Sequence, residues 1–111
     1  MSVDSLKRNI ESEKRYIESE KKNIANYRLK IANIRTRKSR AADQYRNRLK
    51  NASSSSNKKS IRNQKARDWD SFKRQVEGYR KNIESCRDSA TRHRERIKRI
   101  REDIKRARAR R

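Results

Sequence analysis

Four side chains that could bind a metal ion or transfer protons lie in two places in this chain. Glu13 and Glu20 are seven residues apart in the first half, and Cys86 and His93 are seven apart in the second. On facing helices they could meet as metal ligands. A single histidine and a single cysteine match no metal-ligand spacing, however, so we expect no metal. We expect these glutamates to lean out towards arginines, with local opening to another helix as the alternative.

The sequence contains no arrangement of residues that supports catalysis. Nucleophilic catalysis needs a nucleophile, a base and an orienting group held together, and His93 is the single histidine. One glycine is too few for a phosphate-binding loop, and Walker-type and dinucleotide signatures are absent. We predict that the protein is not an enzyme and uses no cofactor. Cys86 cannot form an internal disulfide, and we expect it to be a buried thiol.

The chemistry that the sequence favours is electrostatic. The 111 residues include 36 lysines and arginines against 14 acidic residues, a formal charge of +22. Basic residues are concentrated in 35–50 and 92–111. Such charge attracts phosphates through counterion release, and it attracts acidic proteins as well. The candidate polyanion contacts are Arg35, Arg37, Arg40, Arg46, Arg48, Arg92, Arg94, Arg96, Arg99 and Arg101.

Two features favour an acidic helical protein over nucleic acid as the partner. Four aromatic residues fall at buried positions of the helical pattern, so we expect them not to stack on bases. They are Tyr27, Trp69, Phe72 and Tyr79. An apolar row outside that pattern could dock a helical protein or a second copy, although scattered surface residues would look the same. This possible protein-partner face comprises Tyr16, Ala25, Leu29 and Ala32.

The elements that must position these residues are two long helices. With 45% charged and 29% hydrophobic residues, the chain lacks the apolar material for a layered core. Apolar residues instead recur every seven residues in both halves, with intervening apolar residues at the second heptad position, which is typical of a coiled coil. The predicted seam between the helices contains Ile10, Ile17, Ile24, Ile31, Ile34, Trp69, Phe72, Val76, Tyr79, Ile83, Ile97, Ile100 and Ile104.

The polar segment NASSSSNKKS divides the heptad pattern and predicts a turn. The sequence therefore indicates an all-α fold, a long antiparallel two-helix coiled-coil hairpin that forms one domain over 1–111. We expect helices over about 4–50 and 61–108, a polar loop over about 51–60, and a basic C-terminal tail over 106–111.

An antiparallel seam pairs residues whose numbers have a constant sum, which in this sequence is 110. This register places the small Ala41 opposite Trp69, and it places Lys38 beside Phe72. Two helices with polar residues in their seam bury too little apolar surface to be stable alone. We therefore expect further helices from a partner or a second copy to complete the hairpin. A homo-oligomer or hetero-oligomer is expected.

No apolar stretch approaches the roughly 18 residues that cross a bilayer. The start of the chain, Met1 to Arg8, also lacks the hydrophobic run of a signal peptide. We therefore expect no membrane insertion and a cytoplasmic location, with leaderless export as the alternative.

The order of elements resembles a family of small helical-hairpin proteins. A long helix, a polar break, Trp69 followed by Phe72, and a second helix are similar to the Trp-Xaa-Gly adaptors of bacterial type VII secretion, encoded beside Leu-Xaa-Gly toxins. Ser71 stands where that motif has glycine, and Tyr16 with Glu20 matches the aromatic-x-x-x-acid export signal, but in the first helix. The resemblance implies an adaptor, targeting factor or chaperone for a secreted toxin or effector.

Together these patterns predict a non-enzymatic basic coiled-coil adaptor that binds an acidic helical protein. A sequence-independent DNA-binding or RNA-binding protein is the first alternative, because the charge fits phosphates. A structural, self-assembling coiled-coil rod is the second, because heptad seams associate.

Overall fold

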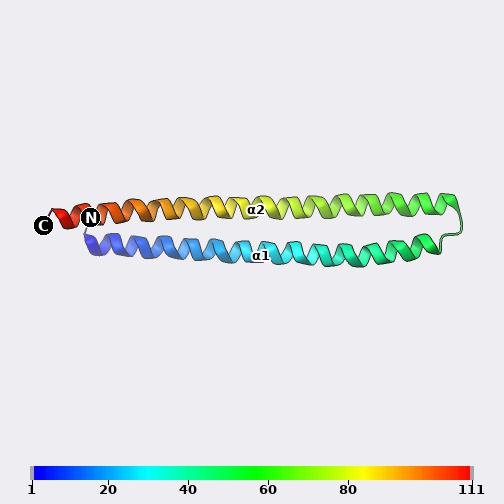
Figure 1. Ribbon diagram of the computed structural model, residues 1–111, viewed down its shortest axis with the longest axis horizontal. Coiled ribbons are helices and arrows are strands. Elements are labelled where there is room, and N and C mark those ends of the chain that lie inside the picture. Colours follow the sequence, from blue (N-terminus) through cyan, green and yellow to red (C-terminus); the bar gives the residue numbers. More distant parts are fainter. Residues whose placement is uncertain (1, 111) are drawn as a thin grey trace. The chain divides into compact units, whose positions relative to one another are not determined.

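The computed structural model describes residues 2–110 and consists of two long α-helices. The first, α1, spans Val3–Lys50, and the second, α2, spans Ser55–Ala109. The two helices run in opposite directions and contact each other as a hairpin (Figure 1). The predicted all-α antiparallel hairpin is therefore confirmed.

The connection between the helices is shorter than the sequence suggested. Helix α2 begins at Ser55, so much of the segment 51–60 is helical and not loop. The Ser54 hydroxyl accepts a hydrogen bond of 3.1 Å from the backbone N–H of Asn57. Serine is a poor residue inside a helix but a good N-cap, because its oxygen satisfies a free N–H of the first turn. One of the serines that suggested a loop therefore starts the helix.

The outer helix ends lie within one residue of the expected positions. The Ser2 hydroxyl accepts a 3.1 Å hydrogen bond from the Ser5 backbone N–H and caps the first turn of α1. Helix α2 continues to Ala109, through most of the residues that we expected to form a basic tail. Arg106 and Arg108 in its last turn interact favourably with the negative end of the helix dipole.

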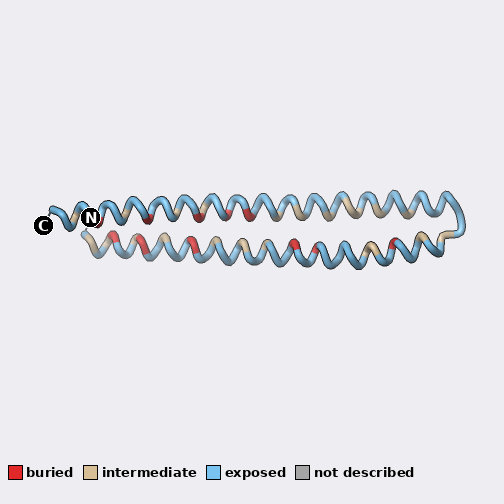
Figure 2. Tube along the Cα trace, viewed as in Figure 1, coloured by how far each residue is buried: buried red, intermediate tan, exposed pale blue. Residues whose placement is uncertain are grey.

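The hairpin divides into two compact units, and each unit contains part of both helices. The terminal unit comprises the described residues up to Asn26 together with those from Asn82 onward. The loop unit comprises Tyr27–Lys81. Within each unit, the buried positions lie on the side of each helix that faces the other helix (Figure 2).

The terminal unit has a continuous apolar core. Val3 and Ile100, which are partly buried, pack against a cluster of five buried side chains. The cluster consists of Leu6, Ile10, Ile17, Ile97 and Ile104. Ile83, Cys86 and Ala90 are also buried in this unit, whereas Ile24 is half-buried. The heptad isoleucines therefore form the seam in this unit, as the period predicted.

The loop unit has a less closed core. Ile31, Ile34 and Tyr45 of α1 are buried, and Ile34 is only 1% exposed. The predicted seam residues that α2 contributes to this unit are all half-buried: Trp69, Phe72, Val76 and Tyr79. The seam here is thus lined by large rings that keep part of their surface in solvent.

Contacts within each unit lie one helical turn away from the predicted pairs, because the sum of 110 places Glu13 opposite Ile97 and Trp69 opposite Ala41. In the terminal unit, Glu13 meets His93. In the loop unit, the ring centroids of Tyr45 and Trp69 are 6.1 Å apart. Lys38 differs from the prediction, because its ammonium lies over the Trp69 ring, 5.5 Å from the centroid, instead of over Phe72. The long, flexible stem of lysine allows this choice of ring.

Candidate functional site

All ten arginines proposed as polyanion contacts are exposed. The loop unit carries Arg35, Arg37, Arg40, Arg46 and Arg48, and the terminal unit carries Arg92, Arg94, Arg96, Arg99 and Arg101. The structure therefore divides these residues between two basic surfaces, one on each unit.

Few of these arginines are neutralised by acidic side chains. Arg46 lies 3.4 Å from Asp43, and Arg96 lies 3.9 Å from Glu13. Within residues 2–110, none of the other eight has a carboxylate within 4.0 Å. Exposed ion pairs add little stability, so even the paired arginines remain available to a partner.

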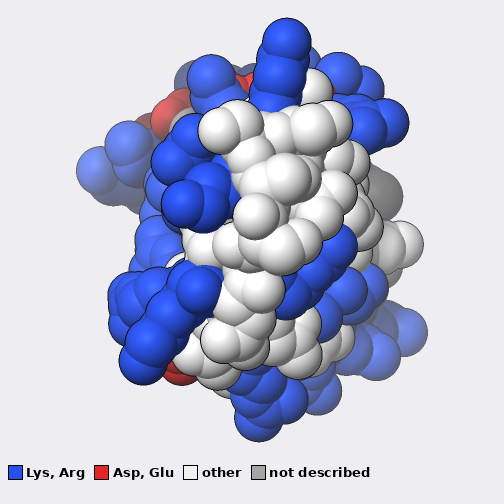
Figure 3. Space-filling view, turned by 90° about the vertical axis from the view of Figure 1, so that its right-hand side faces the viewer, with Lys and Arg blue, Asp and Glu red and all other residues white. Residues whose placement is uncertain are grey.

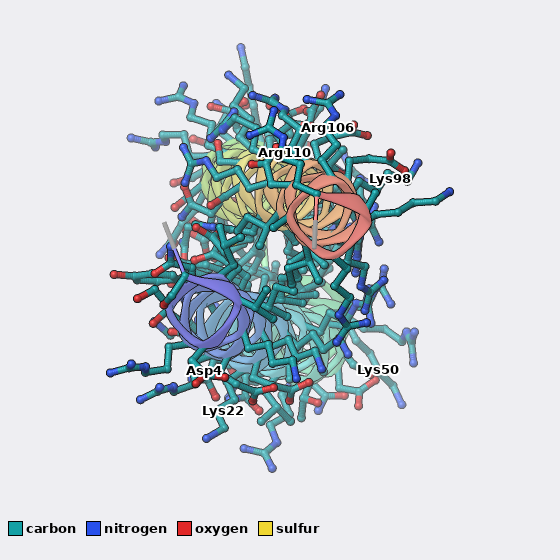
Figure 4. The ribbon with its side chains drawn as sticks, turned by 90° about the vertical axis from the view of Figure 1, so that its left-hand side faces the viewer. Asp4, Lys22, Lys50, Lys98, Arg106 and Arg110 are labelled. Atoms are coloured by element: carbon teal, nitrogen blue, oxygen red, sulfur yellow. The ribbon has the colours of Figure 1, made fainter. Side chains whose placement is uncertain are left out.

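Basic side chains are prominent on the surface at the connection between the helices. At the connection between the helices, lysines and arginines surround a central strip of uncharged residues, and little acidic surface is visible (Figure 3). In the terminal unit, Lys98 and Arg106 of α2, and Arg110 directly after this helix, are directed outward and not towards α1 (Figure 4). Arg106 lies 3.9 Å from Asp103, an exposed pair on the same helix.

The predicted protein-partner face is exposed but divided between the units. Tyr16 and Ala25 belong to the terminal unit, whereas Leu29 and Ala32 belong to the loop unit. Tyr16 is 57% exposed, and its ring stacks on His93 with 4.9 Å between centroids. Leu29 is 62% exposed. The Tyr16 ring therefore packs on His93, which in turn contacts Glu13. Leu29 is the large aliphatic side chain of this row that is open to solvent.

The loop unit contains a groove between its helices that the sequence did not reveal. It encloses about 430 Å³ and has an apolar floor with a charged rim. The floor is formed by Ile34, Trp69, Phe72 and Val76, and the rim by Arg35, Lys38, Asp70, Lys73, Glu77 and Arg80. Asp70 is already paired with Arg74 of its own helix. The rim is therefore predominantly basic above a hydrophobic surface.

Trp69 is the largest side chain that lines this groove, and it lies at one end of the lining on α2. Phe72 and Tyr45 contact it edge-on, with centroids 5.9 Å and 6.1 Å away. The ammonium groups of Lys38 and Lys65 lie over its ring, 5.5 Å and 5.1 Å from the centroid. Each such cation–π contact contributes roughly 0.5–1 kcal/mol at a partly exposed site. The indole is thus held in place and carries positive charge beside it.

Tyr45 is the buried residue that the sequence interpretation missed. It is 5% exposed, and its hydroxyl donates a hydrogen bond to Asp68. This hydrogen bond, followed by burial, raises the pKa of Tyr45 above its ordinary value. A signal was present, because Tyr45 lies two heptads after Ile31 and continues the same series. Arg48 packs over its ring, 5.2 Å from the centroid, and contacts Gln64 at 3.1 Å.

The polar residues in the terminal unit pair inside the seam and do not all lean outward. His93 donates from Nδ1 to the Glu13 carboxylate, and both side chains are about 15% exposed. Burial, and then the neighbouring Glu20 carboxylate, raise the pKa of Cys86. The expectation that Glu13 leans out to arginines is therefore only half correct, because it contacts His93 as well as Arg96. The buried polar groups have partners, as burial requires.

Among the described residues, no group of three or more His, Cys, Asp and Glu side chains is placed to hold a metal ion. The same residues contain no helix long and apolar enough to span a membrane. The chain matches no protein-family model, no curated protein and no solved structure. The functional assignment therefore depends on the surfaces described above.

Proposed function

We propose that the protein is a non-enzymatic adaptor that binds an acidic, helical protein through its basic surface. One observation carries this proposal: exposed, mostly unpaired arginines lie outside, while the aromatic rings of Trp69, Phe72, Tyr27 and Tyr79 are half-buried between the helices. Basic side chains are thus accessible to a partner on both units, whereas the aromatic rings are only partly accessible. An acidic helix complements such a surface and would relieve its self-repulsion.

Nucleic acid is the second candidate, favoured by the surplus of basic residues. Proteins that bind single strands without sequence preference combine basic grooves with aromatic rings on which bases stack. Here the ring of Tyr27 contacts Tyr79, and Lys30 lies over both. Tyr16, the exposed aromatic residue, is stacked on His93. These contacts reduce the stacking surface and favour a protein partner.

Self-assembly of this chain alone is disfavoured by charge. Each copy carries +22, so two copies repel unless an anion lies between them. An acidic partner would supply the missing negative charge and could also complete the helical bundle. A hetero-oligomer therefore fits the composition better than a homo-oligomer.

Purification of the protein from its native source, with and without nuclease, tests the proposal. We expect an acidic, helix-rich protein to remain bound after nuclease treatment and to be released by high salt. Loss of all bound material after nuclease treatment would reject the proposal in favour of nucleic acid. In that case, charge reversal at Arg46, Arg48, Arg99 and Arg101 should weaken nucleic-acid binding and reduce its dependence on salt.

A further inference from the structure

From the groove of the loop unit we infer that this protein docks an acidic amphipathic helix of another protein between α1 and α2. Apolar side chains of that helix would contact Trp69, Phe72 and Val76, and its carboxylates would lie beside Lys38 and Lys73. This inference rests on the proposed function, and it assigns the site and the chemistry of the partner.

The apolar floor of the groove supplies the first argument. In the terminal unit, Ile10 and Ile104 contribute to another hollow of about 430 Å³, but both are at most 8% exposed because they belong to the closed core. In the loop unit, Trp69, Phe72 and Val76 line the groove and are only half-buried. Apolar surface left open beside a polar rim is typical of a protein-interaction site.

The small and charged residues that α1 places in this part of the seam explain why the groove is open. The heptad position after Ile31 holds Lys38, which is exposed and extends over the Trp69 ring. The next intervening position holds Ala41, which is half-buried and too short to fill the space. An isoleucine and a leucine there would close the seam as in the terminal unit. The groove thus results from specific residues of α1.

The dimensions of the groove suit a helix. Its lining on α2 extends from Trp69 to Arg80, about 16 Å at 1.5 Å per residue. A docked helix places anchors at positions i, i+4 and i+7, which span about 10 Å. Two or three aliphatic side chains would therefore fit along the floor.

The charge of the rim selects the occupant. Arg35, Lys38, Lys73 and Arg80 outnumber Asp70 and Glu77, and Asp70 is paired with Arg74. A second copy of this chain, at +22, would be repelled. Bases would have to displace the ammonium groups that already lie over the Trp69 ring before they could stack. An acidic amphipathic helix satisfies both the floor and the rim.

The single tryptophan provides a direct assay, because Trp69 lies in the groove. The probe is a synthetic helical peptide of about 18 residues, free of tryptophan, with leucines on one face and glutamates elsewhere. The control peptide has the same composition with the leucines scrambled. We expect a saturable blue shift of Trp69 emission with the amphipathic peptide. The scrambled peptide should bind at least about tenfold more weakly.

Matched substitutions locate the site. Val76→Glu in the groove should weaken peptide binding at least about tenfold, whereas Asn63→Glu, which introduces the same charge at an exposed site of the same unit outside the groove lining, should not. If Val76→Glu unfolds the chain, as judged by circular dichroism, a substitution in the rim of the groove provides the test. Lys38→Glu should weaken binding severalfold more than Lys59→Glu, the same charge reversal at an exposed site of the same unit outside the groove lining.

Equal binding of both peptides, or equal effects of Lys38→Glu and Lys59→Glu, would overturn the groove assignment. The proposed function fails separately, when nuclease removes everything that binds the native protein. If an acidic protein is retained but Val76→Glu and Lys38→Glu still bind it normally, the adaptor function stands and the groove is not its site.

Discussion

Replacement of Glu13 and His93 by leucine tests whether their contact stabilises the seam of the terminal unit. The two side chains are hydrogen-bonded across the seam, with exposed fractions of 16% and 14%. Glu13→Leu would remove the partner of the His93 ring, and His93→Leu would leave Glu13 with Arg96, 3.9 Å away. Each orphaned polar group costs about 1–3 kcal/mol, and we expect the lower half of this range because some solvent remains.

The double variant Glu13→Leu/His93→Leu should behave differently from the sum of the single variants. It places two apolar side chains where two polar side chains met, and such replacements are often neutral or stabilising by about 1–4 kcal/mol. We therefore expect the double variant to be at least as stable as the natural chain. The coupling energy between Glu13 and His93 should therefore be at least about 2 kcal/mol, because two single costs of about 1 kcal/mol or more are both absent from the double variant.

Urea denaturation followed by circular dichroism measures these free energies. Glu18→Leu is the matched control, since its side chain is 64% exposed and pairs with Lys21 at 3.2 Å. This control should change the free energy of unfolding by less than about 0.5 kcal/mol. Single substitutions at Glu13 and His93 that cost no more than the control, with no coupling energy, would refute the reasoning.

Three further predictions concern other buried groups. Ile34→Ala should lower the free energy of unfolding by about 2–5 kcal/mol, measured in urea, because Ile34 is 1% exposed. A cost no larger than that of Leu29→Ala would contradict this prediction. The hydrogen bond to Asp68, followed by burial, raises the pKa of Tyr45 above its ordinary value of 10.0. The Tyr45 hydroxyl therefore stabilises the folded state fully below pH 10.0, and this stabilisation is lost as the pH rises through the higher pKa of the folded state. The stability difference between the natural chain and Tyr45→Phe should therefore be constant to about pH 9 and decline towards about pH 11; a difference that is independent of pH would contradict this. Burial, and then the neighbouring Glu20 carboxylate, raise the pKa of Cys86, so a maleimide at neutral pH should label the native thiol at least about tenfold more slowly than the thiol in urea. Equal labelling rates would show that the thiol is accessible.

The hairpin and its register could be predicted from the sequence because both depend on spacing. Isoleucines that recur every seven residues require a facing helix, and the antiparallel return fixes which residues meet. The contact between Glu13 and His93 agrees with that register to within one helical turn, because the sum of 110 pairs Glu13 with Ile97. A heptad period constrains backbone positions strongly, even where few apolar residues are present.

The start of α2 could not be predicted from composition. The serines of 51–60 are compatible with a loop or with a helix N-terminus, and the choice depends on one hydrogen bond, from the Asn57 N–H to Ser54. Local propensity is the same in both cases. The structure determines which serine caps the helix, and α2 begins at Ser55.

The groove of the loop unit was missed for a different reason. The heptad pattern assigns Trp69, Phe72 and Val76 to the seam, but it does not say how completely that seam closes. Closure depends on the sizes of facing side chains and on the direction of the Lys38 stem, which packs over Trp69. Tyr45 could have been found by extending the heptad series, although its hydrogen bond to Asp68 could not.

Competition between an acidic helix and nucleic acid tests the central claim most directly. Natural protein is titrated with the amphipathic peptide at physiological salt, in the presence of excess single-stranded oligonucleotide, while Trp69 emission is recorded. The adaptor function predicts that the saturable blue shift persists and that the peptide affinity falls less than about tenfold. Loss of the shift, with the oligonucleotide bound at least about tenfold more tightly than the peptide, would contradict it.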